Sequence, residues 1–150
     1  LLQKSRMKDE KGRSNLKIII DTNIFISFLI HTDFNFIFKL INDGKIDLII
    51  SEELVGEIVR VSSRPKFLKY ILKEQVNLLT EILLKFGVLV KVVSDINVCR
   101  DKNDNFLLAL ARDSNADFIL TGDKDLLSLH KFENTFIVKI AELKQLVKNV

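Results

Sequence analysis

The run Leu16 to Ile20, which ends at Asp21, constrains the fold of this chain more than any other stretch. Its β-branched residues follow one another without polar alternation, a pattern that predicts a strand buried on both faces, as in the middle of a parallel sheet. Asp21 then lies at the carboxyl end of this strand, the edge where open α/β sheets bind ligands. Thr22 is the predicted N-cap of a helix whose apolar positions begin at Ile24. The alternative is that Asp21 only punctuates the turn from strand to helix.

Length and composition predict one globular domain over residues 16–150. The chain has 150 residues, 47% of them hydrophobic, which is enough to bury a core without disulfides or a structural metal. Residues 1–15 mix charged residues, Ser and Gly without periodicity, and we expect them to form a flexible N-terminal tail. The lone cysteine, together with the lack of a membrane-length apolar run or a signal peptide, predicts a soluble, cytoplasmic protein with no membrane partner. The net charge of +3 permits an anionic partner without requiring one.

Further strands and helices alternate along the chain. Helices are predicted from 22 onward, at 34–41, at 51–63 with Ser51 as N-cap, at 66–86, at 106–111, at 126–129 and from 141. Strands are predicted at 46–50, 88–93, 117–121 and 136–139. This alternation indicates right-handed crossovers and an α/β fold, a three-layer α/β/α sandwich. The pattern alone does not determine the order of the strands.

Carboxylates recur where the predicted strands end or the next helices begin. Each has a plain structural explanation: Asp104 would suit the positive end of its helix, Asp123 would suit a turn after Gly122, and Glu57 would pair with Arg60. They would converge on one site if the first and fourth strands were neighbours. The candidates are Asp21, Glu57, Asp101, Asp104, Asp123 and Asp125.

Such a cluster, without histidine or thiolate partners, favours a hard cation, Mg²⁺ or Mn²⁺. These ions bind phosphate oxygens, so the cluster points to hydrolysis of a phosphodiester. His31 and His130 are isolated in the sequence. A basic stretch follows Glu57 and carries interleaved aromatic residues, which is typical of nucleic-acid contact, although a solvated helix face with aromatic residues in the core explains it as well. Its candidate RNA-binding residues are Arg60, Arg64, Lys66, Lys69 and Lys73.

Four segments carry a resemblance to a known family. They read Ile-Ile-Asp-Thr-Asn at 19–23, Ser-Glu-Glu-Leu-Val-Gly-Glu-Ile at 51–58, Cys-Arg-Asp-Lys-Asn-Asp-Asn at 99–105 and Ala-Asp-Phe-Ile-Leu-Thr-Gly-Asp-Lys-Asp-Leu-Leu at 116–127. In this order they resemble the PIN-domain nucleases, and within them the toxin-like branch, of which the VapC toxins of type II toxin–antitoxin systems are the best-known relatives. The resemblance covers about residues 16–129, and the segment from Lys131 onward departs from the family pattern.

The resemblance implies a PIN-like sandwich with a central parallel sheet of four to five strands in the order 3-2-1-4-5. It implies an endoribonuclease that uses Mg²⁺ or Mn²⁺ to activate water, with an RNA substrate, a cognate antitoxin protein that blocks the cleft, and homodimers formed through the helices. By the family pattern the catalytic and metal-binding residues are Asp21, Glu57, Asp104 and Asp123. Auxiliary residues of the site are Thr22, Asn23, Asp101, Thr121 and Asp125.

Several other functions stay open at this point. A structure-specific DNA nuclease, an RNA-processing PIN protein and a PIN fold kept only for binding share the same pattern. A receiver-like signalling module also gathers acids around magnesium, but it has no use for Glu57. A haloacid-dehalogenase-type phosphatase would need a second aspartate where Asn23 stands.

Overall fold

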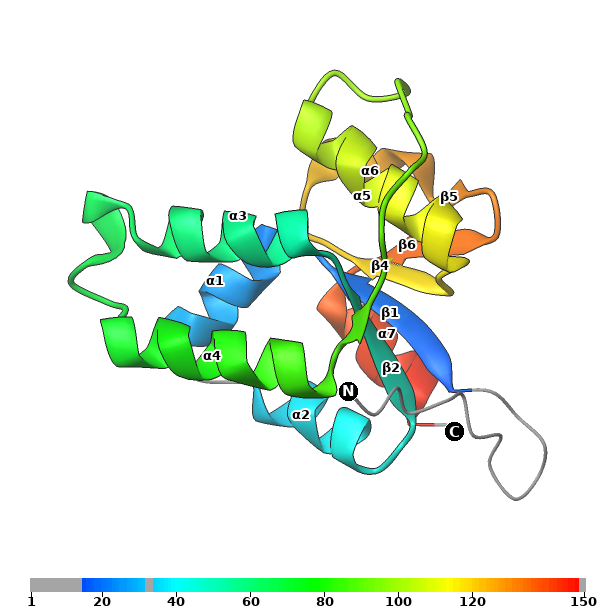
Figure 1. Ribbon diagram of the computed structural model, residues 1–150. Helices are drawn as coiled ribbons and strands as arrows, with labels where there is room; N and C mark the ends of the chain where they lie inside the picture. The colour runs from blue at the N-terminus through cyan, green and yellow to red at the C-terminus, as the bar shows by residue number, and fades with distance from the viewer. Residues whose placement is uncertain (1–14, 32–33, 149–150) are drawn as a thin grey trace.

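The computed structural model describes residues 15–31 and 34–148 as a three-layer α/β/α sandwich (Figure 1). All but the last residue of the predicted tail 1–15 lies outside the described residues. The central strand is β1 (Leu16–Ile20), whose three isoleucines are fully buried. Its apolar run is therefore covered on both faces, as the sequence predicts.

The sheet has the order β3-β2-β1-β4-β6-β5. It is parallel from β3 to β6, and β1 pairs with both β2 and β4, so that Ile20 lies opposite Leu120. The predicted order 3-2-1-4-5 corresponds to the parallel part of this sheet. The added strand β5 (Lys131–Phe132), which the sequence did not predict, pairs antiparallel with β6 and makes a six-stranded sheet in place of the expected four or five. The strand bounds are β2 (Ile46–Ile50), β3 (Val88–Leu89), β4 (Phe118–Leu120) and β6 (Thr135–Val138).

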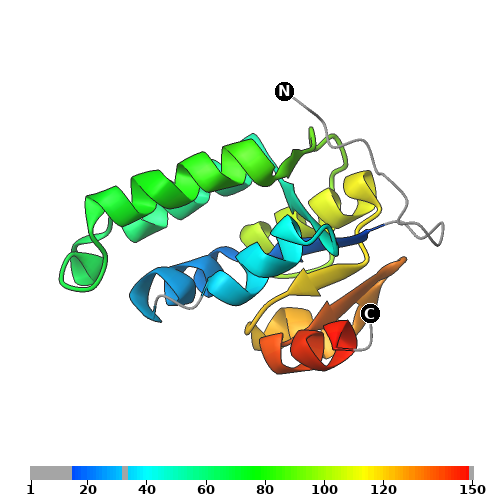
Figure 2. The ribbon, with the colours of Figure 1, turned by 90° about the horizontal axis from the view of Figure 1, so that it is seen from below.

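Helices cover both faces of the sheet (Figures 1 and 2). One face carries α1 (Thr22–His31) and α2 (Asn35–Asn42), and α7 (Ile140–Val147) reaches the same side, where Lys144 lies over the ring of Phe36. The other face carries α5 (Lys102–Ser114). The helices α3 (Glu52–Ser62) and α4 (Lys73–Phe86) form a hairpin, and α6 (Lys124–Leu129) follows β4.

The predicted helix over 66–86 is wrong in its first part. The short 3-10 helix η1 (Pro65–Phe67) and a turn occupy the beginning of this segment, and α4 starts only at Lys73. The chain reverses direction here so that α4 can pack against α3 (Figure 1). Gln75 stabilises the new start, because its side-chain oxygen accepts a hydrogen bond from the Leu72 N–H at 2.7 Å.

Smaller corrections concern where elements begin and end. The third strand stops at Leu89 instead of Val93, and residues 90–101 then run without regular secondary structure to the start of α5. The helix predicted at 106–111 spans Lys102–Ser114, because Asp101 caps it by accepting a hydrogen bond from the Asn103 N–H at 2.8 Å. Ser51 caps α3 as predicted.

No single helix among the described residues is long and apolar enough to cross a membrane. Only α1 and α2 taken together reach that length and composition, and they are bent by 110° relative to each other.

Candidate active site

Asp21 lies at the carboxyl end of β1, beside the end of β4. Its side chain is only 8% exposed, and its Oδ2 accepts a hydrogen bond of 2.7 Å from the Thr121 hydroxyl. The same hydroxyl accepts a hydrogen bond of 3.0 Å from the Asp123 N–H. Thr121, which is 1% exposed, thus connects the acid of one strand to the loop that follows its neighbour. Burial raises the pKa of Asp21, with Glu57 and Asp123 adding repulsion, while hydrogen bonds from Thr121 and the Asn23 N–H oppose the rise.

Glu57 joins this site from α3. Its Oε2 accepts a hydrogen bond of 3.1 Å from the hydroxyl of Thr22, the first residue of α1. The prediction that Thr22 caps α1 is therefore wrong, because Thr22 is already the first residue of the helix and its hydroxyl donates to Glu57. The N–H groups of Ile24 and Phe25 donate to the carbonyl of the preceding residue, Asp21. The predicted pair between Glu57 and Arg60 does not form among the described residues.

Asp104 lies in the first turn of α5 and is 5% exposed. Its Oδ2 is the only buried side-chain oxygen or nitrogen in the described part of the chain without a hydrogen-bond partner. Burial, together with repulsion from Asp123, Asp101, Asp21 and Asp125, raises the pKa of Asp104 to about 6, and burial is the larger cause. Buried oxygens without a partner are rare because they cost about 1–3 kcal/mol each, so this atom points to a ligand.

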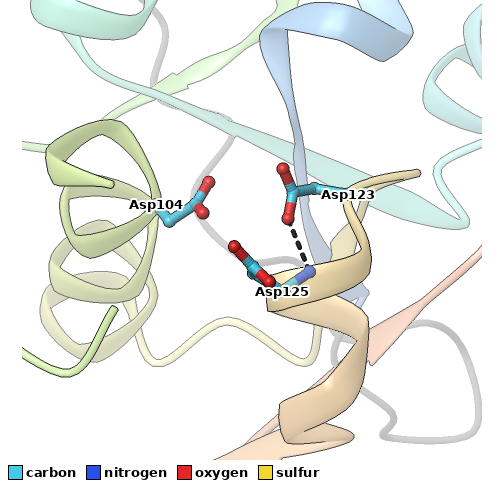
Figure 3. A group of neighbouring side chains, drawn as sticks. All are labelled: Asp104, Asp123 and Asp125. Carbon is cyan, nitrogen blue, oxygen red and sulfur yellow. Dashed lines mark hydrogen bonds between the residues drawn. The ribbon is translucent and has the colours of Figure 1, made fainter. Parts of the chain in front are cut away.

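Asp123 and Asp125 approach Asp104 from the start of α6 (Figure 3). Asp123 caps the helix, because its Oδ1 accepts hydrogen bonds from the Asp125 N–H at 2.8 Å and the Leu126 N–H at 3.2 Å. One carboxylate oxygen from each of Asp104, Asp123 and Asp125 lies within 4.8 Å of the others. Asp125, which the sequence marks only as an auxiliary residue, thus belongs to the tightest acidic group in the described residues, and it also pairs with Arg100 at 3.4 Å.

The four predicted catalytic acids open onto one cavity of about 150 Å³. Thr22, Asn23, Asp101 and Asn103 also line it, whereas Asp125 does not. Of the predicted RNA-binding residues only Arg64 reaches this cavity, and the other four lie exposed on α3, on η1 and its following turn, and at the start of α4. The structure therefore brings the acids together but separates most of the basic residues from them.

The donor set fits a hard divalent cation. The group consists of carboxylate oxygens, the ligands that Mg²⁺ and Mn²⁺ prefer, and includes the partnerless oxygen of Asp104. A bound cation would offset the burial of negative charge, which is the main cause of the raised pKa of Asp21 and Asp104, and the repulsion between the carboxylates. In such a site Asp104, Asp123 and Asp125 would be the closest ligands, and Asp21 and Glu57 line the same cavity as Asp104 and Asp123.

Sequence reasoning missed two residues near the site. Asn103 lines the cavity, and Asn105 holds the segment before α5, with Oδ1 accepting hydrogen bonds from the N–H groups of Val98 and Cys99 at 3.0 and 2.7 Å. Both lie in the first turns of α5, in the polar stretch that precedes the helix predicted at 106–111. The signal available in the sequence was that an asparagine stands on each side of the predicted metal ligand Asp104.

Comparisons with known proteins identify the family to which this chain belongs. The chain is 39% identical over 134 residues to the uncharacterized protein MJ1680 of Methanocaldococcus jannaschii, which covers 86% of this chain and 84% of that protein. The fold of the present chain is similar to that of a chain in a solved structure, "Crystal structure of VapBC2 from Rickettsia felis bound to a DNA fragment from their promoter". The TM-score is 0.58 and the sequence identity is 15%, and the match covers 83% of this chain and 98% of that chain. A family model described as PIN domain matches residues 17–125. The chain therefore belongs to the PIN domain family.

Proposed function

We propose that this protein is a divalent-metal-dependent endoribonuclease. PIN domains are nucleases, so family membership supports the general activity, hydrolysis of nucleic acid. The observation that carries the metal dependence is the partnerless, buried Oδ2 of Asp104, which lies within reach of the carboxylates of Asp123 and Asp125. The RNA preference rests on the resemblance of the sequence motifs to toxin-like family members.

The acidic residues at this edge of the sheet have distinct roles in this proposal. Asp104, Asp123 and Asp125 hold Mg²⁺ or Mn²⁺, which when bound supplies Lewis-acid stabilisation of the phosphoryl oxygens and a lowered pKa of water. Asp21, whose pKa is raised by burial, and Glu57 line the same cavity and orient the attacking water or accept its proton. Thr121 and Thr22 position these two carboxylates through their hydroxyl groups.

Substrate contacts come from Arg64 and the lysine residues that follow it in the sequence. Arg64 contributes a cation to the wall of the acidic cavity, and Lys66, Lys69 and Lys73 extend the positive charge outward along the hairpin of α3 and α4. Tyr70, 61% exposed at the turn of this hairpin, is available for base stacking. Because phosphate contacts release counterions, RNA binding should weaken steeply as salt rises.

The test is cleavage of a labelled single-stranded RNA in the presence of Mn²⁺. The variant Asp104→Asn keeps the size of the side chain and removes its charge, so we expect the rate to fall by about 100-fold or more. Asp43→Asn is the matched control, because Asp43 lies exposed at the end of α2, away from the cavity. Wild-type activity in the Asp104 variant, or wild-type cleavage in EDTA, would refute the proposal.

We further propose that the chain is the toxin of a toxin–antitoxin pair and binds a protein antitoxin. The fold similarity to a chain of the VapBC2 complex supports this role, as do the exposed apolar residues Leu72, Leu78 and Leu84 on and before α4. Induced expression of the wild type in bacterial cells should arrest growth, whereas Asp104→Asn should not. Equal growth of both strains at equal protein levels would argue against a toxin.

A homodimer formed through these helices stays a prediction, which sedimentation analysis can test.

A further inference from the structure

A second cavity, of about 390 Å³, lies between α5 and the segment 90–101 that precedes it. This volume is within the range of small-molecule sites in proteins. The segment contributes Ser94, Asp95, Ile96 and Asn97 to the wall, and α5 contributes Lys102, Asn105, Phe106 and Ala109. We call this cavity the α5 groove.

Hydrogen bonds with side chains of α5 hold the segment 90–101 at both ends of the α5 groove. At one end the Asp113 carboxylate accepts hydrogen bonds from the Val93 N–H at 2.6 Å, the Ser94 N–H at 2.9 Å and the Ser94 hydroxyl. At the other end Asn105 accepts from two N–H groups and donates to the Cys99 carbonyl at 2.8 Å. The opening is therefore shaped before any ligand arrives, which lowers the entropy cost of binding.

The first turns of α5 separate the α5 groove from the acidic cavity. Asp101, Asn103 and Asp104 line the acidic cavity, whereas Lys102, Asn105 and Phe106 line the α5 groove. This division follows from helical geometry, because residues three and four apart share a face. A nucleic-acid strand that crosses the beginning of α5 can therefore place a phosphate in the acidic cavity and a base in the α5 groove.

We propose that the α5 groove binds a guanine base of the same RNA strand whose phosphodiester lies in the acidic cavity. This inference rests on the proposed function. Phe106, half-buried in the wall, supplies an aromatic surface for stacking. The Asp95 carboxylate offers two acceptor oxygens, which match the adjacent N1–H and N2 amino donors of guanine, while uracil presents carbonyl oxygens that the carboxylate repels. Lys102 lies at the same wall and can contact a neighbouring phosphate.

The experiment compares cleavage of RNAs that differ at one position, guanine against uracil, near the cut. The wild type should prefer guanine by about 10-fold in kcat/KM, the size expected for one bidentate base contact. Asp95→Asn should remove this preference, and Phe106→Leu, which keeps an apolar side chain, should raise KM for all substrates. Phe136→Leu is the control for loss of an aromatic ring, because Phe136 is 49% exposed on β6 and lines neither cavity. An unchanged base preference in Asp95→Asn would overturn the inference.

A binding measurement separates this inference from the proposed function. Guanosine 5′-monophosphate and uridine 5′-monophosphate are titrated into the wild type and into Phe106→Leu, and amide shifts are followed by NMR. We expect the guanine nucleotide to shift residues 94–109 of the wild type at lower concentration than the uracil nucleotide, with weaker binding in the variant. This result would support the α5 groove even if no RNA were cleaved, and equal binding of both nucleotides, or binding unaffected by the variant, would overturn it.

Discussion

Thr121 shows how a single residue can organise this site. Its hydroxyl donates to the Asp21 carboxylate and accepts from the Asp123 N–H, so that one buried side chain connects the acid that follows β1 to the acid that caps α6. Threonine suits both demands, since its hydroxyl is both donor and acceptor and its branched side chain fits the end of a strand. A residue with no chemical role of its own thereby positions two residues that carry one.

The variant Thr121→Val should separate positioning from packing. Valine fills nearly the same space but leaves a buried carboxylate oxygen and an N–H without a partner, so the free energy of unfolding should fall by about 1–3 kcal/mol. Urea denaturation measures this change, and RNA cleavage should slow as well. Thr135→Val is the control: Thr135 is 2% exposed and donates to the Ala116 carbonyl, so its loss should lower stability but leave the cleavage rate unchanged. Equal rates in both variants would exclude a positioning role.

Asp104 should make the metal-free protein less stable as pH rises. Its pKa is raised from 3.8 to about 6 in the folded state, so folding favours the protonated form. The favourable contribution of Asp104 to the free energy of unfolding is complete below the pKa of the unfolded state and is lost as pH rises through about 6. The total loss of stability is about 3 kcal/mol. In EDTA, the stability gained by Asp104→Asn over the wild type should therefore be small near pH 4 and largest above pH 7. A stability difference that does not change with pH would contradict this expectation, and Asp43→Asn serves as the control.

At the scale of elements, the junction between α3 and η1 places a cation at the acidic cavity. Arg64 precedes Pro65, which favours the extended backbone seen here, with φ −65° and ψ 144°. The helix therefore ends before Arg64, and the chain turns so that this residue lines the cavity. No hydrogen bond or ion pair of its guanidinium is found within residues 15–31 and 34–148. This group is free to bind a phosphate in bidentate fashion.

Arg64→Ala should lower kcat/KM for RNA by about 10-fold, because a charge-assisted phosphate contact is lost. The slope of log binding constant against log salt concentration should fall by about 1. Arg60→Ala is the matched control, since Arg60 lies one helical turn earlier, is exposed and does not line the cavity. If both variants behave alike, Arg64 acts only as part of a diffuse positive surface.

At the scale of the whole molecule, metal binding should stabilise the fold. The acidic residues come from β1, α3, α5 and the start of α6, so a cation bound among them would hold together elements that are far apart in sequence. When no cation is present, repulsion between these carboxylates adds to burial in raising the pKa of Asp21 and Asp104. The ion would thus act on global stability as well as on chemistry.

Mn²⁺ should therefore raise the melting temperature of the wild type. A ligand bound only by the folded state adds about 2.7 kcal/mol at one hundred times its dissociation constant. Differential scanning fluorimetry with increasing Mn²⁺ measures the shift, and excess EDTA should reverse it. Asp104→Asn should shift much less than Asp43→Asn. The absence of any shift in the wild type at millimolar Mn²⁺ would contradict a metal site in this cavity.

The sequence by itself determined the elements whose signals are local. A continuous apolar run predicts β1, serine before an amphipathic pattern predicts the start of α3, and acids at strand ends mark the edge that carries the site. These features depend on neighbouring residues and on burial patterns that any sheet of this class would impose. The residues of the acidic cavity were therefore predictable as candidates.

The tertiary structure alone decided which of these residues meet. Thr121 and Asp21 are 100 positions apart, and their contact exists only because β1 and β4 are neighbours in the sheet. The break before α4, the antiparallel strand β5, the inclusion of Asp125 in the tightest group and the α5 groove likewise follow from packing between distant segments. Local patterns contain no information about such contacts, because the free energy that selects them arises only when the helices and strands pack together.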